Sequence, residues 1–236
     1  MKTFIREELP QIDLDSEMTE HGRFYITPEG ISYPSITTVL SAMQSAEKKK
    51  VLEQWRARVG EAEANKISRQ ATSRGTGMHT ICENYTCNFP HPMRGHMPTA
   101  IEMFKKLQPV LDERVGTIYA NEIALYSNTL KAAGRSDLVA QFDGVRSIVD
   151  FKSSKKDKKE EWITDYFLQS TAYAIMLEEM YSGIKVPQIA IVIAVEESES
   201  NVQNQVFVKR TADYREQVYQ IFSQYHTNLA NGISAS

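Results

Sequence analysis

Two aspartates and a lysine stand close together in the second half of the chain. Asp137 ends the segment Gly-Arg-Ser-Asp, and Asp150 lies two residues before Lys152. An Asp-Gly pair at 143–144 separates two apolar runs, which predicts a hairpin that brings Asp137 alongside Asp150. Side chains alternate along a strand, so Asp150 and Lys152 should share one face while their apolar neighbours point to the other. Two carboxylates and an ammonium group on a common face predict a site for a divalent metal and a phosphate.

This set of side chains suits the hydrolysis of a phosphodiester bond. The reaction needs charge stabilisation on the attacked phosphate, an activated water and support for the leaving oxygen, and one or two carboxylate-held Mg²⁺ ions supply all three. Mg²⁺ takes few protein carboxylates and keeps several waters, so two aspartates are a reasonable ligand count. We expect Lys152 to contact the phosphate or orient the water, with its pKa lowered where the site is desolvated.

Further polar pairs occur at helical spacing. His79 and Glu83 are four residues apart, just after Arg-Gly-Thr at 74–76, and Gln169 and Tyr173 are also four apart. Residues at this spacing lie on one face of a helix, so each pair can point at a strand-end site. A further carboxylate, on the strand before the hairpin, could add a ligand or a supporting contact; this is Glu122.

The elements that must position these residues change in character along the chain. The first part reads as helices and the second as strands with two helices, which indicates an α/β or α+β sandwich. Residues 1–20 are expected as an extended arm, and Ser35 as a helix N-cap. The expected helices are 34–40, 47–59, 62–71, 76–85, 99–114, 162–180 and 214–229. The expected strands are 24–26, 31–33, 117–126, 137–142, 145–152, 188–195 and 202–209.

Bulk properties exclude several classes of protein. The 236 residues, 42% of them hydrophobic, fit one domain with a mostly helical part at 1–116 and a catalytic core at 117–236. No apolar run reaches membrane-spanning length, and charges at the N-terminus argue against a signal peptide. Two cysteines are too few for a disulfide framework or an iron–sulfur cluster, so we expect reduced thiols in the cytoplasm. A net charge of −3 argues against general duplex coating, although four lysines at 155–159 make the region after Lys152 basic.

Taken in order, these motifs resemble a known family. The segments 74–83, Glu122, 134–137, 150–153 and 169–173 resemble the RecB-like branch of the PD-(D/E)XK nucleases. Within that branch the segments 34–37 and 150–156 look most like the mitochondrial genome maintenance exonucleases and their phage relatives. The resemblance implies a restriction-endonuclease-like mixed sheet flanked by helices, with a helical N-terminal elaboration.

The resemblance also implies roles for individual residues. Metal ligands would be His79, Asp137, Asp150 and the Phe151 carbonyl, with Glu122 and Glu83 matching weaker family positions. Lys152 would be the catalytic lysine, and the pair Gln169 and Tyr173 would support it. The remaining candidates would contact DNA: Arg74, Arg135, Ser153, Lys155 and Lys156.

By the same resemblance the activity would be a DNA exonuclease that uses Mg²⁺ or Mn²⁺. The substrate would be single-stranded or flapped DNA with a free end, in replication, recombination or repair, in a bacterial or phage-infected cell. The chain departs from the iron–sulfur members, which need four cysteines. It also carries Asp150 where Glu is commoner in the wider superfamily, a variation that the RecB-like branch accepts.

Other interpretations stay open at this point. On the same site, the enzyme could be a structure-selective endonuclease, and the fold could also be a catalytically silent nucleic-acid-binding module. Taken singly, Asp-x-Lys and the lysine run are typical of solvated faces, and Arg135 could pair with a sheet aspartate rather than a phosphate. The aromatic residues Trp55, Tyr85 and Trp162 are expected in or near the core, with stacking on single-stranded bases as the alternative.

Overall fold

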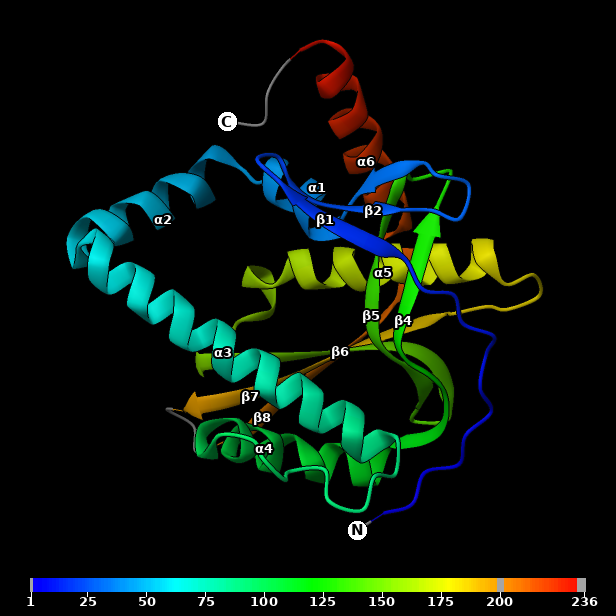
Figure 1. Cartoon of the computed structure of the whole chain (residues 1–236). Coiled ribbons are helices and arrows are strands. Elements are labelled where there is room, and N and C mark those ends of the chain that lie inside the picture. Colours follow the sequence, from blue (N-terminus) through cyan, green and yellow to red (C-terminus); the bar gives the residue numbers. More distant parts are fainter. Residues whose placement is uncertain (1, 199–201, 233–236) are drawn as a thin grey trace.

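The protein is built around one five-stranded mixed sheet (Figure 1). A computed structural model describes residues 2–198 and 202–232, without the side chains of residues 46 and 47. Neighbouring strands are antiparallel except for the third and fourth, which run parallel. In sheet order the strands are β4 (Val115–Ser127), β5 (Ala132–Phe142), β6 (Val145–Lys156), β7 (Gln188–Glu197) and β8 (Asn204–Arg210).

Helices cover both faces of this sheet, and alternation along the strands explains why. Ile148 and Ile191 join the core with α5 and α6, whereas Val149 and Val192 join the core with α3 and α4. Successive strand residues point to opposite faces, so a strand covered on both faces is apolar along its length. The expected α/β class is confirmed. The helices are α1 (Ile36–Ala42), α2 (Ala46–Val59), α3 (Glu61–Thr86), α4 (Pro98–Arg114), α5 (Thr164–Met180) and α6 (Arg215–Ala230), with short turns η1 (Glu160–Trp162) and η2 (Thr211–Asp213).

A small antiparallel sheet precedes α1. It contains β1 (Asp15–Thr19), β2 (Gly22–Ile26) and β3 (Ser32–Pro34). The strands expected at 24–26 and 31–33 are confirmed as the antiparallel pair β2 and β3, and β1 adds a third strand. Ser35 is the N-cap of α1, and its side chain accepts a hydrogen bond of 3.0 Å from the Thr38 amide.

Residues 2–14 form the expected extended arm, without helix or strand apart from an isolated bridge at Arg6, but this arm is not loose. Residues 15–19 form β1, and the backbone amides of Glu7 and Leu9 donate to carbonyls of β4 at 2.9 Å. Phe4 and Leu14 are buried, so this polar segment is held by two apolar anchors and by backbone pairing, which composition does not reveal.

The two helices expected at 62–71 and 76–85 form one continuous helix, α3. The expected break at 72–75 includes Gly75, and glycine weakens a helix by about 1 kcal/mol relative to alanine. Gly77 instead permits close packing of two helices, because a Cβ atom added there would lie 2.8 Å from the Cβ atom of Ala100 on α4. Tertiary packing therefore overrides the local preference.

Strands β5 and β6 are longer than expected, and the extra residues create a fork in the sheet. The two strands pair from the Phe142–Val145 turn back to Leu138–Val149. Beyond that point the first part of β5 pairs with β4, and the rest of β6 pairs with β7. Lys155 and Lys156 thus lie in a strand that extends beyond its expected end at Lys152.

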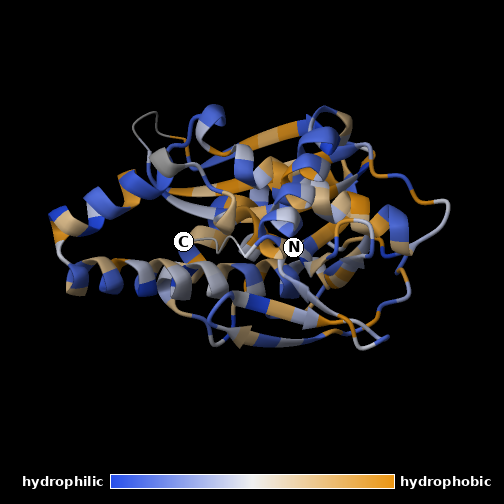
Figure 2. Cartoon of the chain, turned by 90° about the horizontal axis from the view of Figure 1, so that it is seen from above, coloured by the Kyte–Doolittle hydropathy of each residue, from blue (hydrophilic) through white to orange (hydrophobic). Residues whose placement is uncertain are grey.

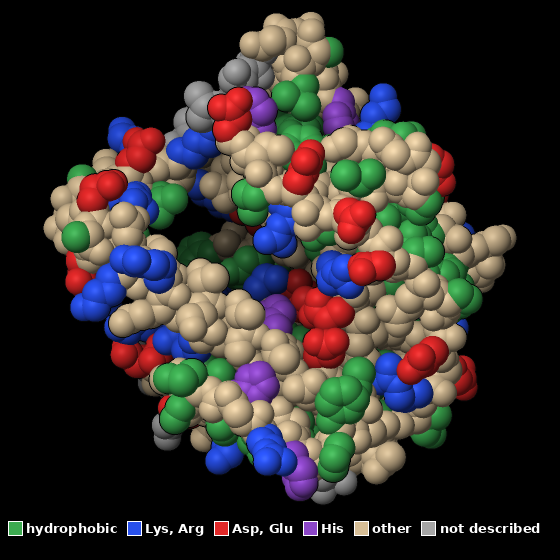
Figure 3. Space-filling view, viewed as in Figure 1, with side chains coloured by type: hydrophobic (Ala, Val, Ile, Leu, Met, Phe, Trp, Pro, Cys, Tyr) green, Lys and Arg blue, Asp and Glu red, His purple; other side chains and the backbone are tan. Residues whose placement is uncertain are grey.

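The helix α2 and the first half of α3, residues 46–74, project away from the sheet, and we call this segment the helical arch. Gly60 joins the two helices with a φ of +85°, a conformation that glycine adopts without strain. Viewed from above, the arch is largely hydrophilic, whereas the strands behind it are hydrophobic (Figure 2). The surface is hollowed between the arch and the body of the protein (Figure 3).

Candidate active site

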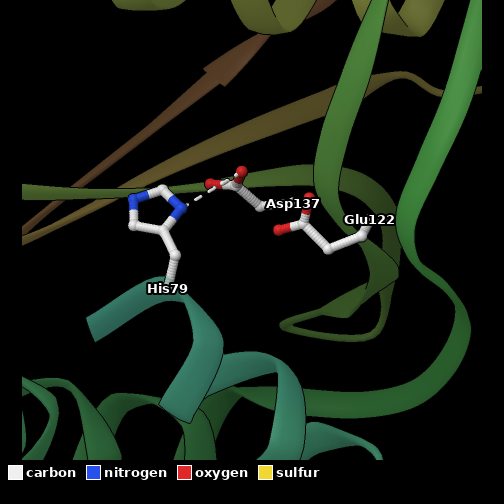
Figure 4. Close-up of side chains that lie close together, drawn as sticks. All are labelled: His79, Glu122 and Asp137. Carbon is white, nitrogen blue, oxygen red and sulfur yellow. Dashed lines mark ion pairs between the residues drawn. The ribbon is translucent and has the colours of Figure 1, made fainter. Parts of the chain in front are cut away.

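Three side chains from three elements converge at the fork (Figure 4). His79 comes from α3, Glu122 from β4 and Asp137 from β5, and each offers one ligand atom within 4.8 Å of the others. The His79 Nδ1 atom lies 3.3 Å from Asp137 Oδ1. An imidazole and two carboxylates at this separation form a candidate metal-binding group.

Glu122 holds its place through an unusual backbone conformation. The flanking register places it opposite Asp137 on the neighbouring strand. Its φ is +45°, in the left-handed region that costs a non-glycine residue about 1–3 kcal/mol. Arg135 donates to the Glu122 carbonyl at 2.9 Å and supports this conformation. Strain held by surrounding contacts is typical of functional sites.

Asp137 also replaces the backbone pairing that ends at the fork. Its Oδ2 atom accepts a hydrogen bond of 2.8 Å from the Phe151 amide. The amide and carbonyl of one strand residue point to the same edge, so the Phe151 carbonyl faces the fork as well. This orientation suits its predicted role as a backbone ligand.

Asp150 and Lys152 share a face, as the alternation predicts. The Lys152 Nζ atom lies 2.5 Å from Asp150 Oδ2, whereas Phe151 between them belongs to the opposite core. Asp150 Oδ2 is buried, and its contact with Lys152 is an ion pair without hydrogen-bond alignment. The ammonium group also lies 5.1 Å from the centre of the Tyr166 ring.

Asp150 lies next to the candidate metal-binding group but is not one of its three residues. Continuing the β5–β6 register by one residue brings it opposite Asp137. Asp150 does not belong to the set of ligand atoms within 4.8 Å of one another in the described part of the chain. Its charge nevertheless acts on His79 and Asp137, so it borders the site.

Burial and crowded carboxylates set the protonation of the acids. Burial, with the charges of Asp137 and Glu83, raises the pKa of Glu122 to about 7. Burial raises the pKa of Asp150 to about 6. The negative charge of Asp137 adds to this rise, whereas the positive charge of Lys152 opposes it. Burial also acts on Asp137, but the His79 and Lys152 charges outweigh it and lower the pKa of this carboxyl.

The pKa of Lys152 moves in the opposite direction from our expectation. Burial lowers it, but Asp150 and Asp137 outweigh burial, so its pKa is raised. Sequence reasoning placed both carboxylates beside the lysine, but it considered only the effect of desolvation on the lysine pKa and left out the attraction of the two negative charges. The same applies to His79. Burial lowers the pKa of its imidazole, but the charge and the hydrogen bond of Asp137 outweigh burial, so the pKa is raised.

Gln169 and Tyr173 lie on the α5 face that contacts β5. Gln169 hydrogen-bonds the Tyr173 hydroxyl, and burial raises the pKa of that hydroxyl. A Cβ atom added at Gly134 would lie 2.9 Å from Tyr173 Cε1, so the glycine of the Gly-Arg-Ser-Asp segment provides room for this ring. The tyrosine therefore buttresses the strand that carries Asp137.

The predicted DNA contacts lie around the site, and several are paired with acids. Arg74 Nη1 lies 2.6 Å from Glu196, and Arg135 Nη2 lies 2.6 Å from Asp13. The Arg135 pairing matches the ion-pair alternative, although its partner is in the N-terminal segment rather than in the sheet. Their DNA contacts stay predictions. Of the other predicted DNA contacts, Lys155 Nζ lies 3.6 Å from Glu197, Ser153 Oγ lies beside Gly75, and Lys156 is exposed. Glu83, a weaker candidate for a metal ligand, is one helical turn after His79 on α3.

Sequence reasoning missed Tyr166 and misplaced Trp162. Tyr166 contacts Lys152, and the spacing 162, 166, 169, 173 on one helical face was the signal that could have found it. Trp162 is 55% exposed, so its expected core position is wrong, whereas Tyr85 is buried as expected.

The residues present fit a divalent cation. The group offers one imidazole nitrogen and two carboxylates, which is a donor set that suits such an ion. Carboxylate oxygens are the ligands that Mg²⁺ and Mn²⁺ prefer. The Cys82 thiol is a poor nucleophile here, because burial raises its pKa well above the usual value.

Comparison with known proteins agrees with this geometry. The family model of the PD-(D/E)XK nuclease superfamily matches residues 39–236. The chain belongs to this superfamily. The match includes α3, the forked sheet and α5, which together carry every residue of the candidate site.

Two individual proteins are similar over part of their length. Mitochondrial genome maintenance exonuclease 1 of Mus musculus is 28% identical over 138 residues, which is 54% of this chain and 38% of the mouse protein. A solved Eubacterium rectale protein, provisionally named an exonuclease, is 11% identical over 68% of each chain, with a TM-score of 0.40. Among the described residues, no helix combines the length and apolarity needed to cross a membrane.

Proposed function

We propose that this protein is a metal-dependent DNA exonuclease that prefers single-stranded or flapped ends and acts in replication, recombination or repair. The observation that carries the proposal is the convergence of His79, Glu122 and Asp137 beside the Asp150–Lys152 pair. A superfamily of nucleases supplies the reaction class, and the similarity to a protein named an exonuclease supports exonuclease action.

In this proposal the side chains of the site have different roles in hydrolysis of the phosphodiester. His79, Glu122 and Asp137, with Asp150 and the Phe151 carbonyl, would hold Mg²⁺ or Mn²⁺. When bound, such an ion polarises the phosphate and lowers the pKa of a water. Lys152 is held by Asp150 and Tyr166, and from there its ammonium group contacts the phosphate or orients the water. Tyr173 and Gln169 are positioning residues, because they act through the strand that carries Asp137.

The preference for a free end follows from the arch. The surface is hollowed between the arch and the body (Figure 3), and in this proposal a single strand enters the hollow by its end. Lysine and arginine side chains border the hollow in Figure 3, and their field acts locally although the net charge of the protein is −3. A closed circular strand has no end to insert and serves as the test substrate.

The deciding experiment compares end-labelled linear and circular single strands with Mg²⁺, with Mn²⁺ and with a chelator. We expect metal-dependent digestion of the linear strand, reduced by at least about 10²-fold in Asp137→Asn and in Lys152→Ala. Asp213→Asn is the matched control, since it removes a carboxylate paired with Arg210 outside the site. Cutting of the circle would favour an endonuclease. DNA binding without cutting under any metal would overturn the proposal in favour of a silent binding module.

A further inference from the structure

Trp162 is exposed because the structure holds it outward. It lies in η1, between β6 and α5, where its amide donates to the Lys159 carbonyl at 3.0 Å. The next residue, Ile163, is fully buried, and Glu160 pairs with Lys209 of β8 at 2.5 Å. The turn is therefore anchored on both sides of the indole, and Trp162 is 55% exposed.

This ring lies at the base of the helical arch and close to the active site. Lys48 of α2 pairs with Asp165 at 2.7 Å, so the arch and the first turn of α5 meet there. Tyr166 is four residues after Trp162 and contacts Lys152. Figure 3 shows hydrophobic side chains deep in the hollow. In the same view, Figure 1 places the beginning of α5 in this region. The ring is thus about one helical turn from the residue that borders Lys152.

The chemistry around the ring matches a nucleotide. Lys159 Nζ lies 5.1 Å from the centre of the indole, so an ammonium group and an open aromatic surface are presented together. A nucleotide offers a flat base for stacking and a phosphate for the ammonium group. Bases in a duplex are already stacked on each other, whereas those of a single strand are available.

We propose that Trp162 is a stacking platform for an unpaired base of the DNA strand that passes the arch, with Lys159 on the adjoining phosphate. The inference rests on the proposed function and deepens it, because it names the single-stranded base as the group that is recognised. Stacking is tolerant of sequence, so Trp162 would help to select strand type rather than base identity.

Tryptophan fluorescence gives a direct test. The chain has two tryptophans, so Trp55→Phe leaves Trp162 as the reporter. In the full chain with a chelator present to prevent cutting, an oligo-dT strand should quench this fluorescence. An abasic strand of equal length carries the same phosphates without bases, and it should quench far less.

Binding measurements test the energetic role. Trp162→Ala should weaken oligo-dT binding roughly 5–150-fold, the equivalent of about 1–3 kcal/mol per stacked base. Trp162→Phe should retain most of the affinity, whereas Trp162→Leu, which is apolar without a π face, should resemble the alanine variant. Phe89→Ala is the matched control, because Phe89 is an aromatic residue of similar exposure, 53%, in another loop.

The outcomes separate the two proposals. Equal affinity of wild type and Trp162→Ala for oligo-dT, or equal quenching by abasic and normal strands, overturns the stacking role even where the enzyme digests DNA. Digestion that is absent while Trp162 still reports base-dependent binding overturns the exonuclease and leaves the platform standing. A wild-type chain that binds no single strand overturns both.

Discussion

Gly75 and Gly77 lie two residues apart in α3, and their replacement by alanine should have different results. Both substitutions gain about 0.8–1.0 kcal/mol of helix propensity. At Gly75 the nearest atom to an added Cβ is Ser153 Oγ at 3.6 Å, an ordinary contact. At Gly77 the added Cβ lies 2.8 Å from Ala100 Cβ, whereas two carbon atoms pack best at about 3.5–4.0 Å. Helices α3 and α4 must then separate by roughly 1 Å, given those preferred distances.

Overpacking of this kind costs about 1–3 kcal/mol. Because the propensity gain is common to both variants, it cancels, and Gly77→Ala should be less stable than Gly75→Ala by that amount. For a chain of this size the difference corresponds to about 2–12 °C in Tm. Gly77→Ala should also lower cleavage, since His79 follows on the same helix.

Thermal and urea unfolding of the two variants provide the measurement. A double-mutant cycle with Ala100→Gly isolates the contact, because this change removes the clashing Cβ atom and the double variant should be more stable than the sum of the two single changes by a similar amount. Equal Tm values for Gly75→Ala and Gly77→Ala, or zero coupling, would refute the reasoning about helix packing.

Three further predictions concern other parts of the molecule. Gly134→Ala should lower the free energy of unfolding by about 1–3 kcal/mol in urea titrations, since its Cβ would lie 2.9 Å from the Tyr173 ring; unchanged stability contradicts this. Mn²⁺ at 100 times its Kd should stabilise the wild type by about 2.7 kcal/mol in thermal unfolding, with a smaller effect in Glu122→Gln. The hydrogen bond from Arg114 lowers the pKa of Asp143 in the folded protein. The pair therefore stabilises the fold fully at pH values above the pKa of Asp143 in the unfolded chain, and this stabilisation is lost as the pH falls through the lower pKa of the folded protein. Arg114→Gln should therefore cost less than about 1 kcal/mol at pH 7, and the difference from wild type should shrink in acid.

The strand that carries Asp150 and Lys152 could be predicted from sequence because the determinants are local. Alternation fixes the faces, and Asp143-Gly144 adopts the positive φ values of a two-residue hairpin turn. The helical spacing around His79 likewise predicts the face of the helix on which its side chain lies. These features depend on neighbours within a few residues.

Features that depend on distant contacts could not be predicted. The continuity of α3 depends on Ala100, and the anchoring of the N-terminal segment depends on β4. The sign of the Lys152 pKa shift depends on the distance between carboxylates from two strands. The positive φ of Glu122 has no local signal, because glutamate gives no reason to expect it.

The helical arch stands apart from the two cores that hold the sheet. Among the side chains that the structure describes, residues 46–73 contribute none to either large cluster, which take up α3 only from Met78 onward. Changes in this segment are thus separated from the determinants of folding and from the reactive centre. The length and charge of this segment can therefore change without removing a side chain from either core or from the candidate metal-binding group.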